Sequence, residues 1–148
     1  MTSSMQPLRG SYLTPSFERA RVYDAMRFGI FTCPPDMRLR DVARMMAAHH
    51  VHCVEVIELG GSDGTDTRGW GVISDLDLVR AGARDGIARD AAATELVTIA
   101  SDETLERAAQ IMGEHDVAHL IVVQPHSDKP VGVLSSLDVA GVLAWGEA

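Results

Sequence analysis

The stretch that decides the fold is GVISDLD at residues 71–77, because a close copy, GVLSSLD, stands at residues 132–138. In both copies a glycine and two aliphatic residues lead to a serine, and an aspartate follows three residues after that serine. This spacing is typical of a helix N-terminus, where both side chains cap free backbone amides. Each copy therefore predicts a short strand that leads directly into a helix.

The repeat extends outward from these residues. Ahead of them, a shift of 66 residues places Thr32 on Thr98 and Met46 on Met112, and after the loops the shift is 61 residues. Two copies of one unit of about 55 residues account for most of the chain from residue 22 to residue 144, so the repeat decides the architecture. We divide the chain into an N-terminal extension with a short helix at 1–21, a first motif at 22–84 and a second motif at 85–146.

Hydrophobic periodicity changes in the same order within each copy. The first helix follows from Leu39, Val42 and Met46, which share one helix face, and Asp36 stands where an N-cap is expected. In the first copy we predict strands at 51–57 and 70–73, a loop at 59–69 and a helix from Ser74 to Ala81. In the second copy we predict elements at 97–99, 103–114, 117–124, 131–134 and 136–144.

Each copy is thus β-α-β-β-α, and the fold class is α/β in the α+β sense. A small sheet with helices on one face cannot bury both faces alone. We therefore expect the two motifs to pack with pseudo-twofold symmetry into one compact disc.

Composition excludes several classes of protein. The 148 residues include 13 basic and 21 acidic side chains, and this acidic balance disfavours nucleic acid as a partner. The chain has no apolar run long enough for a membrane span and no apolar core of a secretory signal near its N-terminus, so we expect a cytoplasmic protein. Cys33 and Cys53 are too few for a disulfide framework and are expected to be reduced thiols.

The order of elements and the two signatures resemble the CBS motif, and two motifs in tandem resemble a CBS pair, or Bateman module, in a stand-alone CBS domain-containing protein. The resemblance implies a cleft between the motifs that binds an adenine nucleotide or adenosyl compound as a regulatory signal. By position, it implies that Asp77 and Asp138 take the ribose hydroxyls, and that Ser74 and Ser135 contact ribose or phosphate.

Physical chemistry supports this assignment and also offers a simpler one. A carboxylate in the first helical turn is favoured by the helix dipole and accepts two hydrogen bonds from a vicinal diol. A single serine and aspartate at this spacing are also explained as a helix cap with no ligand. Because strand, signature and repeat are in register, we favour ligand contact for at least one copy.

The resemblance also implies that adenine lies against residues 30–34 and 96–100, with Thr32 and Thr98 facing the cleft. Two departures from the family pattern matter. Proline is missing from both central strands, and the position where nucleotide-binding relatives often carry arginine holds Cys53 and His119. Since a neutral thiol cannot pair with phosphate and histidine does so only in part, we expect AMP, adenosine or an S-adenosyl compound rather than ADP or ATP.

His49, His50, His52 and Cys53 crowd one corner of the first motif, but their spacing does not fit a closed zinc site, and we predict no metal. His49 and His50, like His115 in the second copy, stand at a helix C-terminus, where the dipole favours histidine. The segment at 60–66 superficially suggests a calcium loop, yet it lacks the twelfth-position glutamate of an EF-hand and is interpreted as a turn.

Three function classes follow. The leading hypothesis is a ligand-sensing regulatory module with no required cofactor, which signals to an unknown protein partner or through its own assembly. The alternative is a structural or protein-interaction module of the same fold that has lost its ligand. An enzyme is the third, and it finds no support because the chain carries no recognisable nucleophile or phosphate-binding motif and no catalytic residue is assigned.

Two predictions concern surfaces. A homodimer is expected through apolar helix faces, which include Met45, Met46, Ala47, Leu78, Val79, Ile111, Met112, Val139, Val142 and Leu143. A helix is expected to begin at Thr14 and Pro15 and to run to Met26, across the seam between the copies or onto a partner subunit. This helix would bury Phe17, Ala20 and either Val22 or Tyr23.

Overall fold

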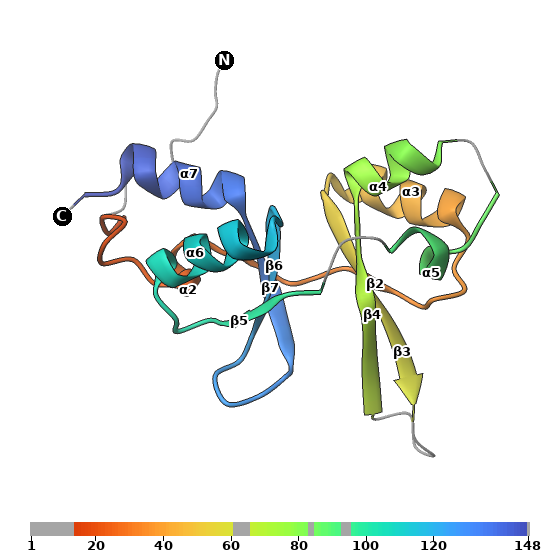
Figure 1. Cartoon of the computed structure of the whole chain (residues 1–148), viewed down its shortest axis with the longest axis horizontal. Helices are drawn as coiled ribbons and strands as arrows, with labels where there is room; N and C mark the ends of the chain where they lie inside the picture. Colours follow the sequence, from red (N-terminus) through yellow and green to blue (C-terminus); the bar gives the residue numbers. More distant parts are fainter. Residues whose placement is uncertain (1–13, 61–65, 83–84, 93–95, 148) are drawn as a thin grey trace. The chain divides into compact units, whose positions relative to one another are not determined.

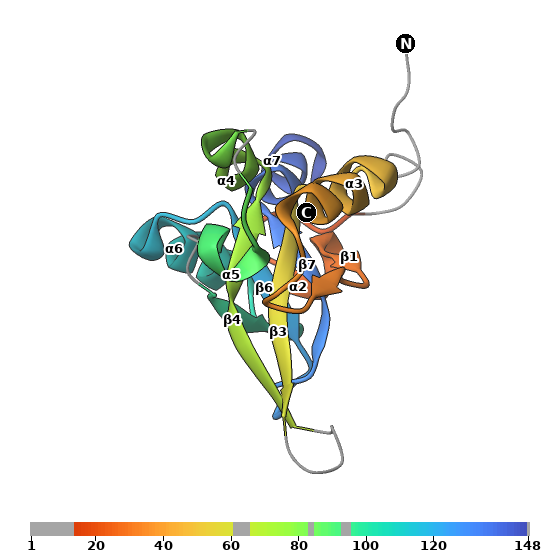
Figure 2. The same cartoon turned by 90° about the vertical axis from the view of Figure 1, so that its right-hand side faces the viewer.

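The computed structural model describes residues 14–60, 66–82, 85–92 and 96–147. The chain forms two compact units, whose elements are labelled in Figures 1 and 2. One unit is Ile30–Leu96, and the other joins the chain before Ile30 to the chain from Val97 onward.

The Ile30–Leu96 unit has a three-stranded sheet in the order β2-β3-β4. Strand β2 runs parallel to β3, and β3 pairs antiparallel with β4. Figures 1 and 2 show the helices near one end of this sheet, with the β3–β4 ladder continuing beyond them. The elements are β2 (Thr32–Cys33), α3 (Leu39–His49), β3 (Cys53–Gly60), β4 (Asp66–Ser74), α4 (Asp75–Ala81) and α5 (Ala88–Ala91).

The second unit has a four-stranded sheet in the order β1-β7-β6-β5. Strand β5 runs parallel to β6, while β6 and β1 both pair antiparallel with β7. Its elements are α2 (Val22–Ala25), β1 (Arg27–Phe28), β5 (Thr98–Ala100), α6 (Leu105–His115), β6 (His119–Val123), β7 (Pro130–Ser135) and α7 (Ser136–Trp145). The predicted β-α-β-β-α order is thus confirmed in both copies, and the chain has a mixed α+β fold.

Each unit has its own core, built by the predicted periodicities. In β3, Val54 and Val56 are fully buried and pack with Val42 and Met46 of α3. Alternate strand residues share one sheet face and helix residues four apart share one helix face, so both patterns converge on the same core. The second unit repeats this with Leu120 and Val122 of β6 against Leu105, Ala108 and Met112 of α6.

The segment ahead of each repeat packs with the other repeat. Val22 donates its backbone N–H to Glu103 O at 2.9 Å, and Leu105 donates to Ala20 O at 3.0 Å. The same bonds recur between the equivalent residues, from Ala88 to Met37 at 2.7 Å and from Leu39 to Gly86 at 3.0 Å. Short helices α2 and α5 therefore occupy equivalent places, and the compact units do not coincide with the sequence repeats.

The N-terminal helix is much shorter than predicted. Arg19 and Ala20 both donate backbone N–H groups to Ser16 O, which closes a single turn, and helix resumes only at Val22–Ala25. The prediction of a helix start at Thr14 and Pro15 is wrong because the backbone that follows pairs with the β5–α6 connection instead of with itself. Burial followed the prediction more closely: Ala20 and Val22 are fully buried and Phe17 packs against the core.

Two local predictions are also corrected. Helix α3 is capped at Arg38 without a side-chain bond, so Asp36 is not its N-cap but lies in the turn before it. The predicted loop at 59–69 is shorter, because the antiparallel ladder continues to the pair Gly60–Asp66. Residues 61–65, where the calcium-like sequence lies, fall outside the described residues. Strand β1 and helix α5 were not predicted.

None of the described helices combines the length and the apolar character that a membrane span requires.

Candidate ligand-binding site

Both signatures form the predicted reciprocal caps. Ser74 donates its backbone N–H to Asp77 Oδ2 at 2.9 Å, and Asp77 N–H donates to Ser74 Oγ at 3.1 Å. Ser135 and Asp138 make the same two bonds at 2.9 and 3.1 Å. The aspartates are only 6% and 8% exposed, so each repeat holds one buried carboxylate at the start of α4 or α7 in a fixed orientation.

Arg27 lies beside the second of these carboxylates. Its Nε is 3.9 Å from Asp138 Oδ1, while Asp138 Oδ2 accepts the capping bond, so the two carboxylate oxygens have different neighbours. The Arg27 side chain is 68% exposed, which leaves its guanidinium accessible to a ligand. A carboxylate that accepts hydroxyl hydrogen bonds next to a guanidinium that binds phosphate suits a ribose phosphate. Arg27 could not be identified from the sequence pattern, because its strand, β1, lies more than 100 residues before Asp138 in the chain.

The signature glycine makes this approach possible. Gly132 in β7 is the register partner of Phe28 in β1. A Cβ at Gly132 would collide with the carbonyl oxygen of Arg27 and with Cε of Met26. Glycine at this position therefore allows β1 to pair with β7 and brings Arg27 to the site.

In the Ile30–Leu96 unit, three predicted site residues share one face of the sheet. Cys53 is the register partner of Ser74, and Thr32 is the partner of Glu55, two residues further along β3. Paired residues and alternate strand residues point to the same side. Thr32 is exposed, whereas Cys53 is buried. The structure thus brings Thr32, Cys53 and Ser74 onto one surface.

The second unit repeats this arrangement. His119 is the register partner of Ser135, and Thr98 is the partner of Ile121, two residues beyond His119. Thr98 is exposed and His119 is half-buried. The predicted positions therefore correspond between the repeats, although the chemistry of their side chains differs.

The Ile30–Leu96 unit also has hollows on its own surface. Thr32 lines an open pocket of about 490 Å³ together with Glu58 and Arg89, whereas Asp77 lines a different one of about 290 Å³ with Arg80 and Asp90. Neither of these two pockets holds both the predicted threonine and the predicted aspartate.

The two cysteines are buried free thiols. Burial raises the pKa of Cys33 to about 11. Burial, with the negative charges of Asp75 and Glu55, raises the pKa of Cys53 to about 12. Both thiols are protonated at neutral pH, and Cys53 cannot replace the arginine of nucleotide-binding relatives.

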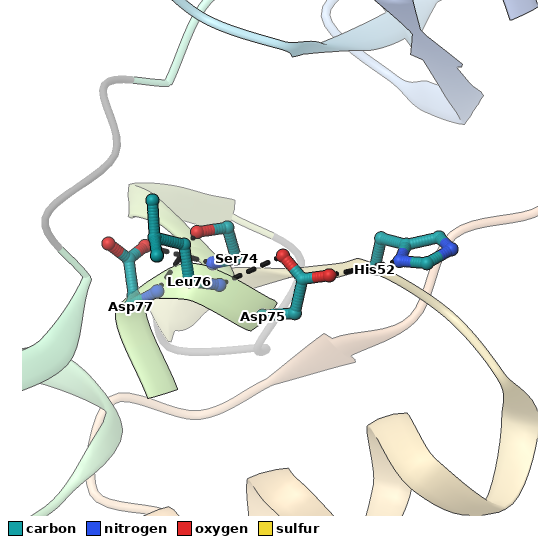
Figure 3. A network of polar contacts seen from close by, with 5 residues as sticks. All are labelled: His52, Ser74, Asp75, Leu76 and Asp77. Atoms are coloured by element: carbon teal, nitrogen blue, oxygen red, sulfur yellow. Dashed lines mark hydrogen bonds and ion pairs between the residues drawn. The ribbon is translucent and has the colours of Figure 1, made fainter. Parts of the chain in front are cut away.

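The crowded histidines have separate contacts. The His49 ring stacks on Phe31 with centroids 4.4 Å apart, and His50 ends α3 in the left-handed conformation with φ of 54°. His52 Nδ1 lies 3.0 Å from Asp75 Oδ2, as Figure 3 shows. Among residues 14–60, 66–82, 85–92 and 96–147, no group of three or more His, Cys, Asp or Glu side chains is placed to hold a metal ion.

The contact between His52 and Asp75 adjoins the first capping box. Asp75 Oδ1 accepts the backbone N–H of Leu76 at 2.8 Å (Figure 3). Asp75 also donates its backbone N–H to His52 O at 2.9 Å. In the second repeat, Ala118 and Ser136 keep the backbone bond at 2.8 Å but lack the side-chain pair. This side-chain pair therefore distinguishes the two repeats.

Sequence reasoning missed two functional candidates, Arg27 and Glu55. Glu55 was visible only as a departure from the family's proline, and its equivalent in the second repeat is Ile121. It is 4% exposed, and burial raises the pKa of its carboxyl group.

Comparison with known proteins places this geometry in a family. The family model of the CBS domain matches residues 22–84 and 88–144. A CBS domain-containing protein, YhcV of Bacillus subtilis (strain 168), is 28% identical over 124 residues, which cover 80% of this chain and 82% of that protein.

Two solved structures show the same fold. The CBS domain pair of protein MJ0100, in complex with 5′-methylthioadenosine and S-adenosyl-L-methionine, has a TM-score of 0.70 at 18% identity and covers 83% of this chain and 98% of its own. CBS domain protein PAE2072 from Pyrobaculum aerophilum, complexed with AMP, has a TM-score of 0.67 at 26% identity. The match covers 84% of this chain and 98% of that protein's chain. With two matched domains, two capping signatures and the repeated β-α-β-β-α order, the chain belongs to the CBS domain family as a tandem pair.

Proposed function

We propose that this CBS pair is a regulatory module that binds an adenine nucleotide or adenosyl compound. The observation that carries the proposal is the buried aspartate of each signature, which the capping box holds in the same orientation in both repeats. A preoriented carboxylate binds a vicinal diol without first having to be ordered. The adenosine compounds bound by the solved pairs of MJ0100 and PAE2072 support the ligand class.

The charges of the site support a ligand of low charge. Arg27 offers one exposed guanidinium beside Asp138, whereas Cys53 and His119 stand where further phosphate-binding arginines are expected. One cation suits a monophosphate better than a triphosphate. We therefore propose AMP, adenosine or an S-adenosyl compound as the ligand.

We further propose that the module acts without catalysis, in the cytoplasm, through a protein partner or a homodimer. The apolar surface that supports a homodimer differs from the predicted one, because Met46, Met112, Val139 and Val142 are buried inside their own units. Most of the large apolar side chains that stay exposed among the described residues lie on α4 and α7, and α7 has no basic residue in its last turn. Those on α4 and α7 are Leu76, Val79, Leu137, Leu143 and Trp145, while Tyr23 of α2 and Phe28 of β1 are also exposed.

Titration calorimetry with AMP, adenosine, 5′-methylthioadenosine and S-adenosylmethionine tests ligand binding. We expect at least one compound to bind the wild-type chain, and Asp138→Asn to weaken it by about tenfold or more, because the amide keeps one capping acceptor but loses the charge. Asp128→Asn, which removes the same charge from an exposed residue of the same unit, is the matched control. Binding by none of the four compounds would favour the alternative, a structural or protein-interaction module without a ligand.

A further inference from the structure

Glu55 is a buried carboxyl group in the middle of strand β3. The side chain is 4% exposed, and its Oε1 has no hydrogen-bond partner among the residues that the structure describes. Buried polar atoms are nearly always paired, because an unpaired one loses its hydration without compensation. An unpaired buried carboxyl oxygen therefore calls for a specific explanation.

Among the described residues, Glu55 forms no ion pair with a basic side chain. Its register partners are Thr32 on β2 and Val72 on β4. Glu55 Oε2 lies 3.5 Å from the position that a Cβ on Gly69 would occupy, and the end of Leu96 crowds the same position. Glu55 in turn acts on the neighbouring thiol, because its negative charge is one cause of the raised pKa of Cys53. The carboxyl group thus lies among apolar groups and one exposed threonine.

The second repeat shows what this position accommodates without a carboxylate. Ile121, the equivalent residue, is 1% exposed and has Thr98 and Val133 as register partners. A threonine and a valine thus flank the position in both repeats. Packing alone is satisfied by an aliphatic side chain, so the carboxyl group of Glu55 is not explained by the core.

We propose that Glu55 determines ligand specificity by charge: it favours an adenosyl ligand that brings a positive charge or a hydrogen-bond donor, and it disfavours a phosphate. This inference rests on the proposed ligand-binding function and on the position of Glu55 beside Thr32. In a poorly hydrated site, a carboxylate attracts a cation and repels an anion far more strongly than it does in water. A bound cation also supplies the missing partner of Oε1.

The ligands of the solved relatives provide a charge series on one adenosine scaffold. AMP is anionic, 5′-methylthioadenosine is neutral at its thioether, and S-adenosylmethionine carries a sulfonium cation. Calorimetry measures the dissociation constants of all three for the wild-type chain, for Glu55→Gln and for Asp41→Asn. Asp41 is an exposed residue of α3 in the same unit and serves as the matched control for loss of one charge.

We expect Glu55→Gln to lower the ratio of the affinity for S-adenosylmethionine to the affinity for AMP by about tenfold or more, while Asp41→Asn leaves that ratio unchanged. Glu55→Ile introduces the residue that the second repeat has at this position, Ile121. It tests the loss of the charge in a second variant, one whose side chain is suited to the core. An unchanged ratio in both Glu55 variants overturns the role of Glu55 and leaves the proposed function standing. Failure of all three compounds to bind the wild-type chain overturns both.

Discussion

Replacing Glu55 with isoleucine should stabilise the protein. The variant removes a buried carboxyl group whose Oε1 has no partner in the described part of the chain, and an unsatisfied buried group of this kind costs about 1–3 kcal/mol. The isoleucine has a precedent at Ile121, which is flanked by a threonine and a valine as Glu55 is. For a chain of this size each kcal/mol shifts the melting midpoint by about 2–4 °C, so a gain of about 2 kcal/mol raises it by about 4–8 °C.

The pH dependence of this gain identifies its cause. Burial raises the pKa of Glu55, so the folded chain holds a proton there over a pH range in which the unfolded chain has released it. Wild-type stability therefore falls as pH rises from the ordinary carboxyl range through the folded-state pKa of Glu55. Calorimetric melting midpoints of Glu55→Ile and wild type should differ more at neutral than at weakly acidic pH. A midpoint for the variant at or below that of the wild type, or a difference independent of pH, would show that the carboxyl group already has a partner.

Two further predictions test the site strand and the proposed interface. Gly132→Ala should lower the free energy of unfolding by about 1–3 kcal/mol and weaken ligand binding, because its Cβ collides with the backbone of β1. Gly141→Ala in α7 is the control: a Cβ there meets nothing within 4 Å, so thermal melting should show a slight stabilisation. Sedimentation should give a species of twice the 15.9 kDa chain mass, and Leu137→Glu, on the exposed face of α7, should shift it to the monomer. Lys129→Glu, at an exposed residue between β6 and β7, should leave the protein dimeric, and a wild-type monomer at all concentrations contradicts the homodimer.

The repeated fold could be predicted because its signals are local. Leu39, Val42 and Met46 at helical spacing and Val54 and Val56 at strand spacing each report which face of their own element is buried, and the structure confirms both faces. The serine and aspartate of each signature likewise lie within one turn of each other, so their cap could be predicted from spacing alone.

The segments ahead of each repeat, which contain α2 and α5, could not be predicted in the same way. Their backbone hydrogen bonds are to residues that are distant in the sequence. Residues 17–26 have helical spacing, yet Val22 and Tyr23 donate to Glu103 O and Ser101 O. A signal was present in the repeat, since Asp24 and Ala25 correspond to Asp90 and Ala91 at the shift of 66 residues. That correspondence marks α2 and α5 as equivalent elements, although it does not say which repeat each one packs with.

The two repeats differ in charge at positions that the repeated sequence pattern does not include. The second unit has an exposed cation, Arg27, beside its signature aspartate, whereas the first has a buried acid, Glu55, on the strand face that carries Cys53 and Thr32. These charges have opposite signs on otherwise equivalent scaffolds. Because electrostatic preference is set by the charges nearest the ligand, the two repeats should not bind the same group equally well. Under the proposed function, these opposite charges would allow the pair to discriminate among adenosine compounds by the group attached to the adenosine.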